Sequence, residues 1–304
     1  MSSLIEQAAQ RLEQLRRAGV MVPEMAGAAV EAPPAAPQRM AAPVPDVREE
    51  NVVSSRRVEL DLAMLESTGI VTPNAPRSHI ADEYRVIKRP LISNAMGRGA
   101  AALAHGNLIM VTSAVSGEGK SFTSVNLAMS IAAELDHTVM LVDADVARPS
   151  VLRMLGLPDG PGLLDLLEGK AEMSGVLMKT NIDKLTILPS GTPHARATEL
   201  LASDAMRVLL DDISKRYPDR IVIFDSPPLT MTTEARVLAS QMGQVVLVVQ
   251  ADMTLQADVQ HALAMIESCP VKMMLLNKVR VEAKGKYGYG YGYGYGHEQK
   301  NHPA

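Results

Sequence analysis

Residues 107–135 read NLIMVTSAVSGEGKSFTSVNLAMSIAAEL, and this stretch decides the fold. The apolar run NLIMVTS is typical of a buried strand, and FTSVNLAMSIAAEL is typical of a packed helix. Between them lies a glycine-containing turn, AVSGEGKS, at residues 114–121. In this context the backbone N–H groups of the turn converge on phosphate oxygens, and the helix N-terminus adds its positive dipole end. The stretch therefore predicts a P-loop nucleotide site.

Two polar residues of this loop have predicted tasks. Lys120 supplies a cation to the β- and γ-phosphates, and the Ser121 hydroxyl can ligate Mg²⁺, so we expect ATP and Mg²⁺ as cofactors. Ala114 stands where the general pattern GxxxxGK[ST] begins with glycine. The predicted nucleotide-binding residues are Ser116, Gly117, Glu118, Gly119, Lys120, Ser121 and Phe122.

Working outward, short apolar runs alternate with amphipathic stretches of helical length. The runs are residues 137–145, 184–190, 220–228, 244–250 and 272–278, and the helical stretches are residues 120–135, 199–216, 232–242 and 254–268. Such alternation predicts an α/β fold with a doubly wound, mostly parallel sheet, in which ligands bind at the carboxyl ends of the strands.

Three aspartates follow the predicted strands. Asp143 and Asp145 end the run VMLVDAD, and Asp225 ends RIVIFD. Residues two apart on a strand share a face, so both members of the first pair can point at one Mg–nucleotide. Asp225 can hold Mg²⁺, and Asp143 or Asp145 can accept the proton of an attacking hydroxyl. The alternative is that all three merely cap the helices that follow.

Composition divides the chain into four parts. Residues 1–20 predict an amphipathic helix, residues 21–57 a Pro/Ala-rich linker, residues 58–281 the P-loop domain, and residues 282–304 a flexible tail. Both the linker and the tail are expected to be disordered. Within the domain, a first helix is predicted over residues 79–89, ending at Pro90, which cannot continue it.

Charge and apolar pattern narrow the function classes. The net charge is −4 and basic residues are dispersed, so nucleic acid is not expected as a partner. The single cysteine, Cys269, fits a reducing compartment and a buried packing role. No apolar run reaches the roughly 18 residues of a membrane span. We therefore expect a cytoplasmic protein whose membrane role comes through a partner.

Tyrosines crowd the tail. Five of the seven lie in YGYGYGYGYG, namely Tyr287, Tyr289, Tyr291, Tyr293 and Tyr295. Alternating glycine is poor material for a core but suits a substrate segment that must enter an active site. A flexible tail spans roughly 15–25 Å, comparable with the radius of a domain of this size, so a neighbouring subunit's site is within reach. The sequence thus predicts phosphorylation in trans within an oligomer; the alternative is an unmodified linker.

The combined motifs resemble the bacterial tyrosine kinases that regulate capsule and exopolysaccharide production. The resemblance rests on SGEGKS, VDADVARPS, IVIFDSPP and the LPSG…ELL stretch around Gly191 and Glu199. The N-terminal SLIEQAAQRLEQLRRAG is similar to autokinases of exosortase-associated exopolysaccharide loci. The resemblance implies a P-loop fold of the MinD/ParA type.

The resemblance also implies roles and partners. Asp143 would be the base, with Asp145 and Asp225 at the metal. Asp82, Arg85 and Lys88 match the family's ring-assembly signature with two conservative changes. Expected partners are a transmembrane activator of the polysaccharide co-polymerase type, further copies of the chain, and a tyrosine phosphatase.

Two rival functions share this architecture. A positioning or partitioning ATPase usually has an additional lysine early in the loop, where this chain has Val115. A non-catalytic, nucleotide-gated scaffold would bind ATP without modifying the tail.

Overall fold

The computed structural model describes residues 55–73, 77–99, 103–217 and 219–280. The predicted N-terminal helix, most of the linker, and the tail with its five tyrosines lie outside these residues. The proposed domain boundaries therefore stay predictions. None of the helices in the described ranges is long and apolar enough to cross a bilayer.

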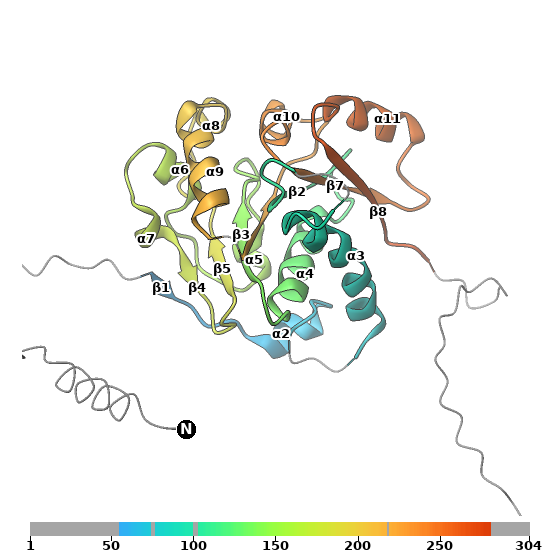
Figure 1. Ribbon diagram of the computed structural model, residues 1–304, viewed down its shortest axis with the longest axis horizontal. Helices are drawn as coiled ribbons and strands as arrows, with labels where there is room; N and C mark the ends of the chain where they lie inside the picture. The colour runs from blue at the N-terminus through green and yellow to red at the C-terminus, as the bar shows by residue number, and fades with distance from the viewer. Residues whose placement is uncertain (1–54, 74–76, 100–102, 218, 281–304) are drawn as a thin grey trace, which may run out of the picture. The chain divides into compact units, whose positions relative to one another are not determined.

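An eight-stranded sheet forms the centre of the described residues (Figure 1). Its order is β1-β4-β5-β3-β6-β2-β7-β8, and every pairing is parallel except that between β4 and β5. The strands are β1 (Arg56–Arg57), β2 (Leu108–Ser113), β3 (Thr138–Asp143), β4 (Met178–Lys179), β5 (Leu185–Leu188), β6 (Arg220–Asp225), β7 (Gln244–Gln250) and β8 (Val271–Asn277).

Helices cover both faces of the sheet, as the doubly wound prediction requires. One face packs α6 (Leu163–Leu167), α7 (Met173–Val176), α8 (Ala197–Leu201), α9 (Asp204–Arg216), α10 (Thr233–Ala239) and α11 (Gln256–Met265). The other packs α2 (Leu62–Ser67), α3 (His79–Ala95), α4 (Lys120–Ala132) and α5 (Val151–Met154). Along β2, Leu108 and Met110 enter the first core while Ile109 and Val111 enter the second. This alternation is why central strands read as continuous apolar runs.

All six strands predicted from the apolar runs are present, and the four helical stretches form α4, α8 with α9, α10 and α11. The short elements β1, β4, α2, α5, α6 and α7 were not predicted. Cys269 is buried, as expected. The pattern failed for these short elements because two to six residues are too few to establish a period.

The predicted end of the first helix at Pro90 is wrong, because α3 continues to Ala95. A proline at this position leaves the carbonyl of Val86 without its helical partner. Val86 and Pro90 are both exposed, so that carbonyl lies on the solvent side, where water can satisfy it. On the opposite side Leu91 is fully buried and holds the following turn against the core.

Candidate active site

The predicted P-loop connects β2 to α4 at the carboxyl end of the sheet. Gly117 and Gly119 have φ of +85° and +98°, a region that favours glycine. At Gly119 a Cβ atom would also lie 2.2 Å from Nδ2 of Asn277. Backbone conformation therefore favours glycine at both positions, and the close approach of Asn277 is a second reason at Gly119.

Ala114 needs no glycine, because it is not among the residues with positive φ. Its side chain is fully buried, and its carbonyl accepts a 2.6 Å hydrogen bond from the Thr230 hydroxyl. The departure from the general loop pattern is therefore compatible with the strand–loop–helix geometry.

Lys120, Ser121, Asp145 and Asp225 converge at the mouth of the loop. The Lys120 ammonium lies 2.6 Å from Oδ2 of Asp145, 3.2 Å from the Ser121 hydroxyl and 3.9 Å from Oδ1 of Asp225. A lysine held between two carboxylates offsets part of their charge in a buried setting. The structure thus brings together the cation predicted to bind phosphate and the predicted metal ligands.

Asp225 is fully buried and only half satisfied. Its Oδ1 accepts a 3.1 Å hydrogen bond from Ser124 of α4, whereas Oδ2 has no partner among the described residues. Burial raises the pKa of Asp225 to about 6, against the lowering effect of the nearby Lys120. An orphaned carboxylate oxygen beside the P-loop fits a Mg²⁺ site.

No group of three or more acidic, His or Cys side chains within the described ranges could by itself hold a metal. Mg²⁺ is commonly held through one or two carboxylates together with substrate phosphates and water, so this site suits a metal that arrives with a nucleotide. Ser121, Asp145 and Asp225 are the side chains that fit that role.

Asp143 lies beside Asp225, to which it is paired in register across β3 and β6. Its Oδ2 accepts 3.0 Å hydrogen bonds from the N–H groups of Ser150 and Val151, and its Oδ1 accepts a 3.3 Å bond from the N–H of Asp145. Burial, and then the charge of Asp225, raise the pKa of Asp143 to about 7, although the backbone hydrogen bonds oppose this rise.

The strand-alternation argument for Asp143 and Asp145 does not hold, because β3 ends at Asp143. Asp145 lies in the following turn, where its Oδ1 accepts a hydrogen bond from the N–H of Arg148. Its approach to Lys120 is set by that turn rather than by the strand's two-residue period.

The side chains of two residues predicted to bind the nucleotide point away from the mouth of the P-loop. Glu118 is buried and accepts hydrogen bonds from the N–H of Val115, the N–H of Gln250 and the Thr254 hydroxyl, so it braces the loop against the end of β7. The Phe122 ring lies beside Gly69 and lines a groove below α3. Any contribution of these two residues to nucleotide binding would come from backbone N–H groups. The Ser116 hydroxyl contacts the Met231 sulfur at 3.1 Å.

Sequence reasoning missed Asn277 and Lys278 at the end of β8. Asn277 donates to the carbonyl of Glu118 at 2.8 Å, and Lys278 donates to the carbonyl of Gly117 at 2.6 Å. Both therefore hold the P-loop backbone. The sequence signal that could have found them is a polar pair at the carboxyl end of a predicted parallel strand. The same rule, that ligands bind at the carboxyl ends of such strands, identified Asp225.

The three residues that match the ring-assembly signature do not lie on one surface. Asp82 and Arg85 form an exposed ion pair on α3. Lys88 instead points inward, where its ammonium lies 2.7 Å from Glu134 and donates to the carbonyl of Ser130 at 2.5 Å. Lys88 joins α3 to α4 and is not on the surface.

Gly191 and Glu199 of the LPSG…ELL stretch also lie in different environments. Gly191 has φ of +91°, and a Cβ there would lie 2.5 Å from the Asp165 carboxylate, so it serves a turn. Glu199 is exposed in the first turn of α8.

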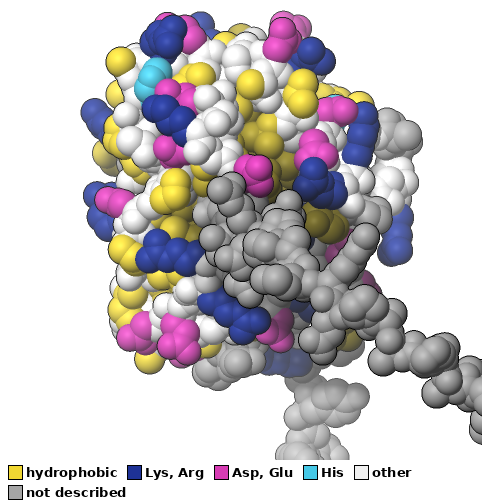
Figure 2. All heavy atoms as spheres, turned by 90° about the vertical axis from the view of Figure 1, so that its left-hand side faces the viewer, with side chains coloured by type: hydrophobic (Ala, Val, Ile, Leu, Met, Phe, Trp, Pro, Cys, Tyr) yellow, Lys and Arg dark blue, Asp and Glu magenta, His cyan; other side chains and the backbone are white. Residues whose placement is uncertain are grey.

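On the face shown in Figure 2, basic and acidic side chains are interspersed with apolar ones.

Comparisons with known proteins agree with this architecture. Residues 105–278, more than half of the chain, match the ParA family, described as NUBPL iron-transfer P-loop NTPase. The tyrosine-protein kinase CpsD of Streptococcus agalactiae is 32% identical over 176 residues, covering 57% of this chain and 75% of that protein. The tyrosine-protein kinase ptk of Acinetobacter johnsonii is 32% identical over 184 residues, covering 60% of this chain but 25% of that longer protein.

Among solved structures, the chimerical protein CapA2B2 superimposes with a TM-score of 0.58 at 26% identity, covering 73% of this chain and 93% of that one. Its coverage extends well beyond the P-loop to most of the described sheet and helices. The chain therefore belongs to the bacterial tyrosine-protein kinases, with the fold of the ParA-type P-loop NTPases.

Proposed function

We propose that this protein is an ATP-dependent tyrosine kinase that phosphorylates Tyr287, Tyr289, Tyr291, Tyr293 and Tyr295 of its own tail. The observation that carries the proposal is the convergence of Lys120, Ser121, Asp145 and Asp225 at one loop, with Asp143 alongside. Membership of a family whose relatives are named tyrosine-protein kinases supports the reaction class.

In the proposed reaction, the loop amides and Lys120 bind the β- and γ-phosphates of ATP. Ser121, Asp145 and Asp225 would hold Mg²⁺, which would neutralise charge that develops on the transferred phosphoryl group.

We assign the base role to Asp143. A base works best with a pKa near the operating pH, and the pKa of Asp143 is raised to about 7. Its Oδ1 accepts only the long 3.3 Å bond within the described residues, which leaves it open to a proton. The tyrosine oxygen then bonds to the γ-phosphorus, the bond to the β,γ-bridging oxygen breaks, Asp143 takes the hydroxyl proton, and ADP leaves.

The test is phosphosite mapping by mass spectrometry on purified protein with Mg–ATP. Lys120→Met should abolish tail phosphate, and replacement of the five tail tyrosines by Phe should leave ATP hydrolysis in place. Each variant is run with and without the cytoplasmic segment of a candidate membrane partner. ATP hydrolysis with unmodified tyrosines under every condition would instead indicate a positioning ATPase or a nucleotide-gated scaffold.

We further propose transfer between subunits of a homo-oligomer, with a ring as one form. The autophosphorylation rate should then fall faster than protein concentration in a dilution series. Strictly first-order kinetics with a monomeric mass would contradict transfer in trans.

In the cell, the proposed role is regulation of exopolysaccharide synthesis or export at the inner face of the membrane. Support comes from the resemblance to the bacterial tyrosine kinases. In that family, kinases without a membrane segment act with a separate transmembrane protein of the co-polymerase type. A tyrosine phosphatase would reset the tail. Co-purification of the kinase with such a membrane protein, lost on deletion of the latter's cytoplasmic segment, tests this assignment.

A further inference from the structure

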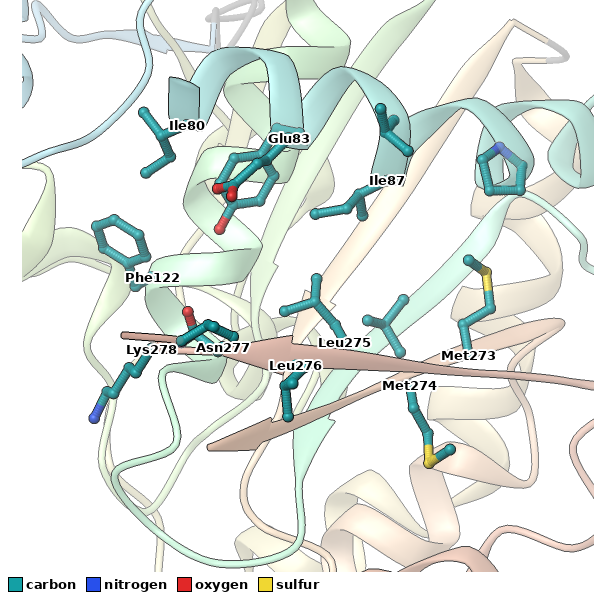
Figure 3. Close-up of a pocket in the computed structure, with 15 residues that line it drawn as sticks. Ile80, Glu83, Ile87, Phe122, Met273, Met274, Leu275, Leu276, Asn277 and Lys278 are labelled. Carbon is teal, nitrogen blue, oxygen red and sulfur yellow. The ribbon is translucent and has the colours of Figure 1, made fainter. Parts of the chain in front are cut away.

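A groove of about 800 Å³ separates α3 from β8 (Figure 3). Ile80 and Ile87 of α3 line one wall, and Met273 and Leu275 of β8 line the other. We call it the edge groove. It is distinct from the phosphate site, although Asn277 and Lys278 border both.

β8 is the last strand in the order of the described sheet, so one edge of its backbone pairs with no other described strand. Apolar side chains are exposed here on both sides of the strand: Met274 is 63% and Leu276 61% exposed on the face turned away from α3, and Val279, beyond the strand end, is 54% exposed (Figure 3). Val86 on the α3 wall is 74% exposed. A long apolar edge strand is a template for another strand and is normally covered or blunted.

The chain itself supplies a segment at this place. Lys278 has φ of +58°, which turns the backbone as β8 ends, and Val279 lines the groove. Residues 281–304 continue directly from there. Nine residues, 278–286, separate β8 from Tyr287, more than the two to five of common hairpin loops.

The tail also has the period that the groove requires. In an extended strand residues two apart point to the same side, so all five tyrosines of residues 287–295 share one face and the glycines share the other. The groove lies on one side of β8, toward α3, and presents apolar walls there. Seven residues of β8 span roughly 23 Å, which residues 287–293 would match.

We propose that residues 287–295 of the unmodified tail bind in the edge groove of their own chain, as an additional antiparallel strand along β8. Main-chain hydrogen bonds to the strand edge provide the pairing, and the tyrosine rings cover Val86, Ile87 and Met273. Binding in this form withholds the tyrosines from a neighbouring active site.

Phosphorylation would prevent this binding, a consequence that rests on the proposed kinase function. Each phosphate adds nearly two negative charges, and most of the described residues that line the groove are apolar. The one cation among them, Lys278, already donates to the carbonyl of Gly117. Glu83, the one acidic residue among the described side chains that line the groove, adds repulsion. A tail that has been modified once would therefore stay released.

The test uses full-length protein with Lys120→Met, which keeps the tail unmodified whether or not the chain is a kinase. Chymotrypsin cleavage after the tail tyrosines is followed by mass spectrometry. Val86→Glu places a charge in the groove, and Val208→Glu is the matched control, an exposed valine on α9. When binding and release are fast, cleavage tracks the free fraction, so a tail bound about 90% of the time is cleaved about tenfold more slowly.

We expect Val86→Glu to speed cleavage about tenfold and Val208→Glu to leave it unchanged. Amide hydrogen exchange of β8 should quicken when the five tyrosines are replaced by serine. Equal cleavage in all three proteins, or unchanged exchange in β8, would overturn the proposal. Protection that disappears on dilution would also overturn it, because the bound tail would then belong to another copy.

Discussion

Replacement of Asp225 by Asn tests the electrostatics of the site most directly. The pKa of this fully buried carboxyl is raised from 3.8 to about 6, so the folded protein binds a proton more tightly than the unfolded chain. A raised carboxyl pKa makes stability fall as pH rises from about 4 through about 6. Two pKa units correspond to about 3 kcal/mol of unfolding free energy that the charged form costs above this window.

Asp225→Asn removes the charge and can keep the hydrogen bond that Oδ1 accepts from Ser124. The new amide nitrogen replaces Oδ2, which has no partner in the described residues, so no existing bond is lost there. We expect the variant to be more stable than the parent by about 3 kcal/mol at pH 8, and by roughly half as much at pH 5, which lies inside the titration window.

The assay is urea unfolding of both proteins at several pH values, without nucleotide. Asp159→Asn is the matched control, because Asp159 is exposed and lies outside the site. Mg–ATP should stabilise the parent by mass action and should stabilise Asp225→Asn much less. A variant that is less stable at pH 8, or a gain that does not change with pH, would refute this account of the carboxylate cluster.

Three further outcomes follow from the same geometry. Gly119→Ala should weaken ATP binding without unfolding the protein, because it adds about 1–3 kcal/mol of strain at φ +98° beside Asn277; unchanged affinity by calorimetry would contradict this. Lys88→Met should lower the unfolding free energy by about 2 kcal/mol, which is less than the loss of a fully buried ion pair costs, because Glu134 is a quarter exposed. An unchanged unfolding free energy together with loss of the oligomer would instead place Lys88 at a subunit interface. The autophosphorylation rate at saturating ATP should rise with pH through about 7, because Asp143 must be deprotonated to act as base; a flat profile would remove it from that role.

Much of the site was available from local pattern. The P-loop, the aspartates after the strands and the strand–helix alternation depend on periods of two and 3.6 residues and on a few glycines. Each of these is set by neighbours in the sequence. That is why the doubly wound sheet was predicted correctly. The approach of Asp145 to Lys120, in contrast, is set by the turn after β3 and not by the strand period from which it was predicted.

The failures concern contacts between distant segments. Glu118 braces Gln250, 132 residues away, and Asn277 reaches the loop from 159 residues away. Lys88 points to α4 rather than to the surface because α3 packs on that helix. Local pattern does not fix the order in which strands lie side by side, and this order decides which distant residues meet.

The sequence by itself therefore determined the class of fold and the position of the P-loop within it. Only the tertiary structure decided which side chains face that site, since a side chain's direction depends on what packs against its element. It also decided that α3 continues through Pro90, because the carbonyl left unpaired there faces solvent while Leu91 is anchored in the core.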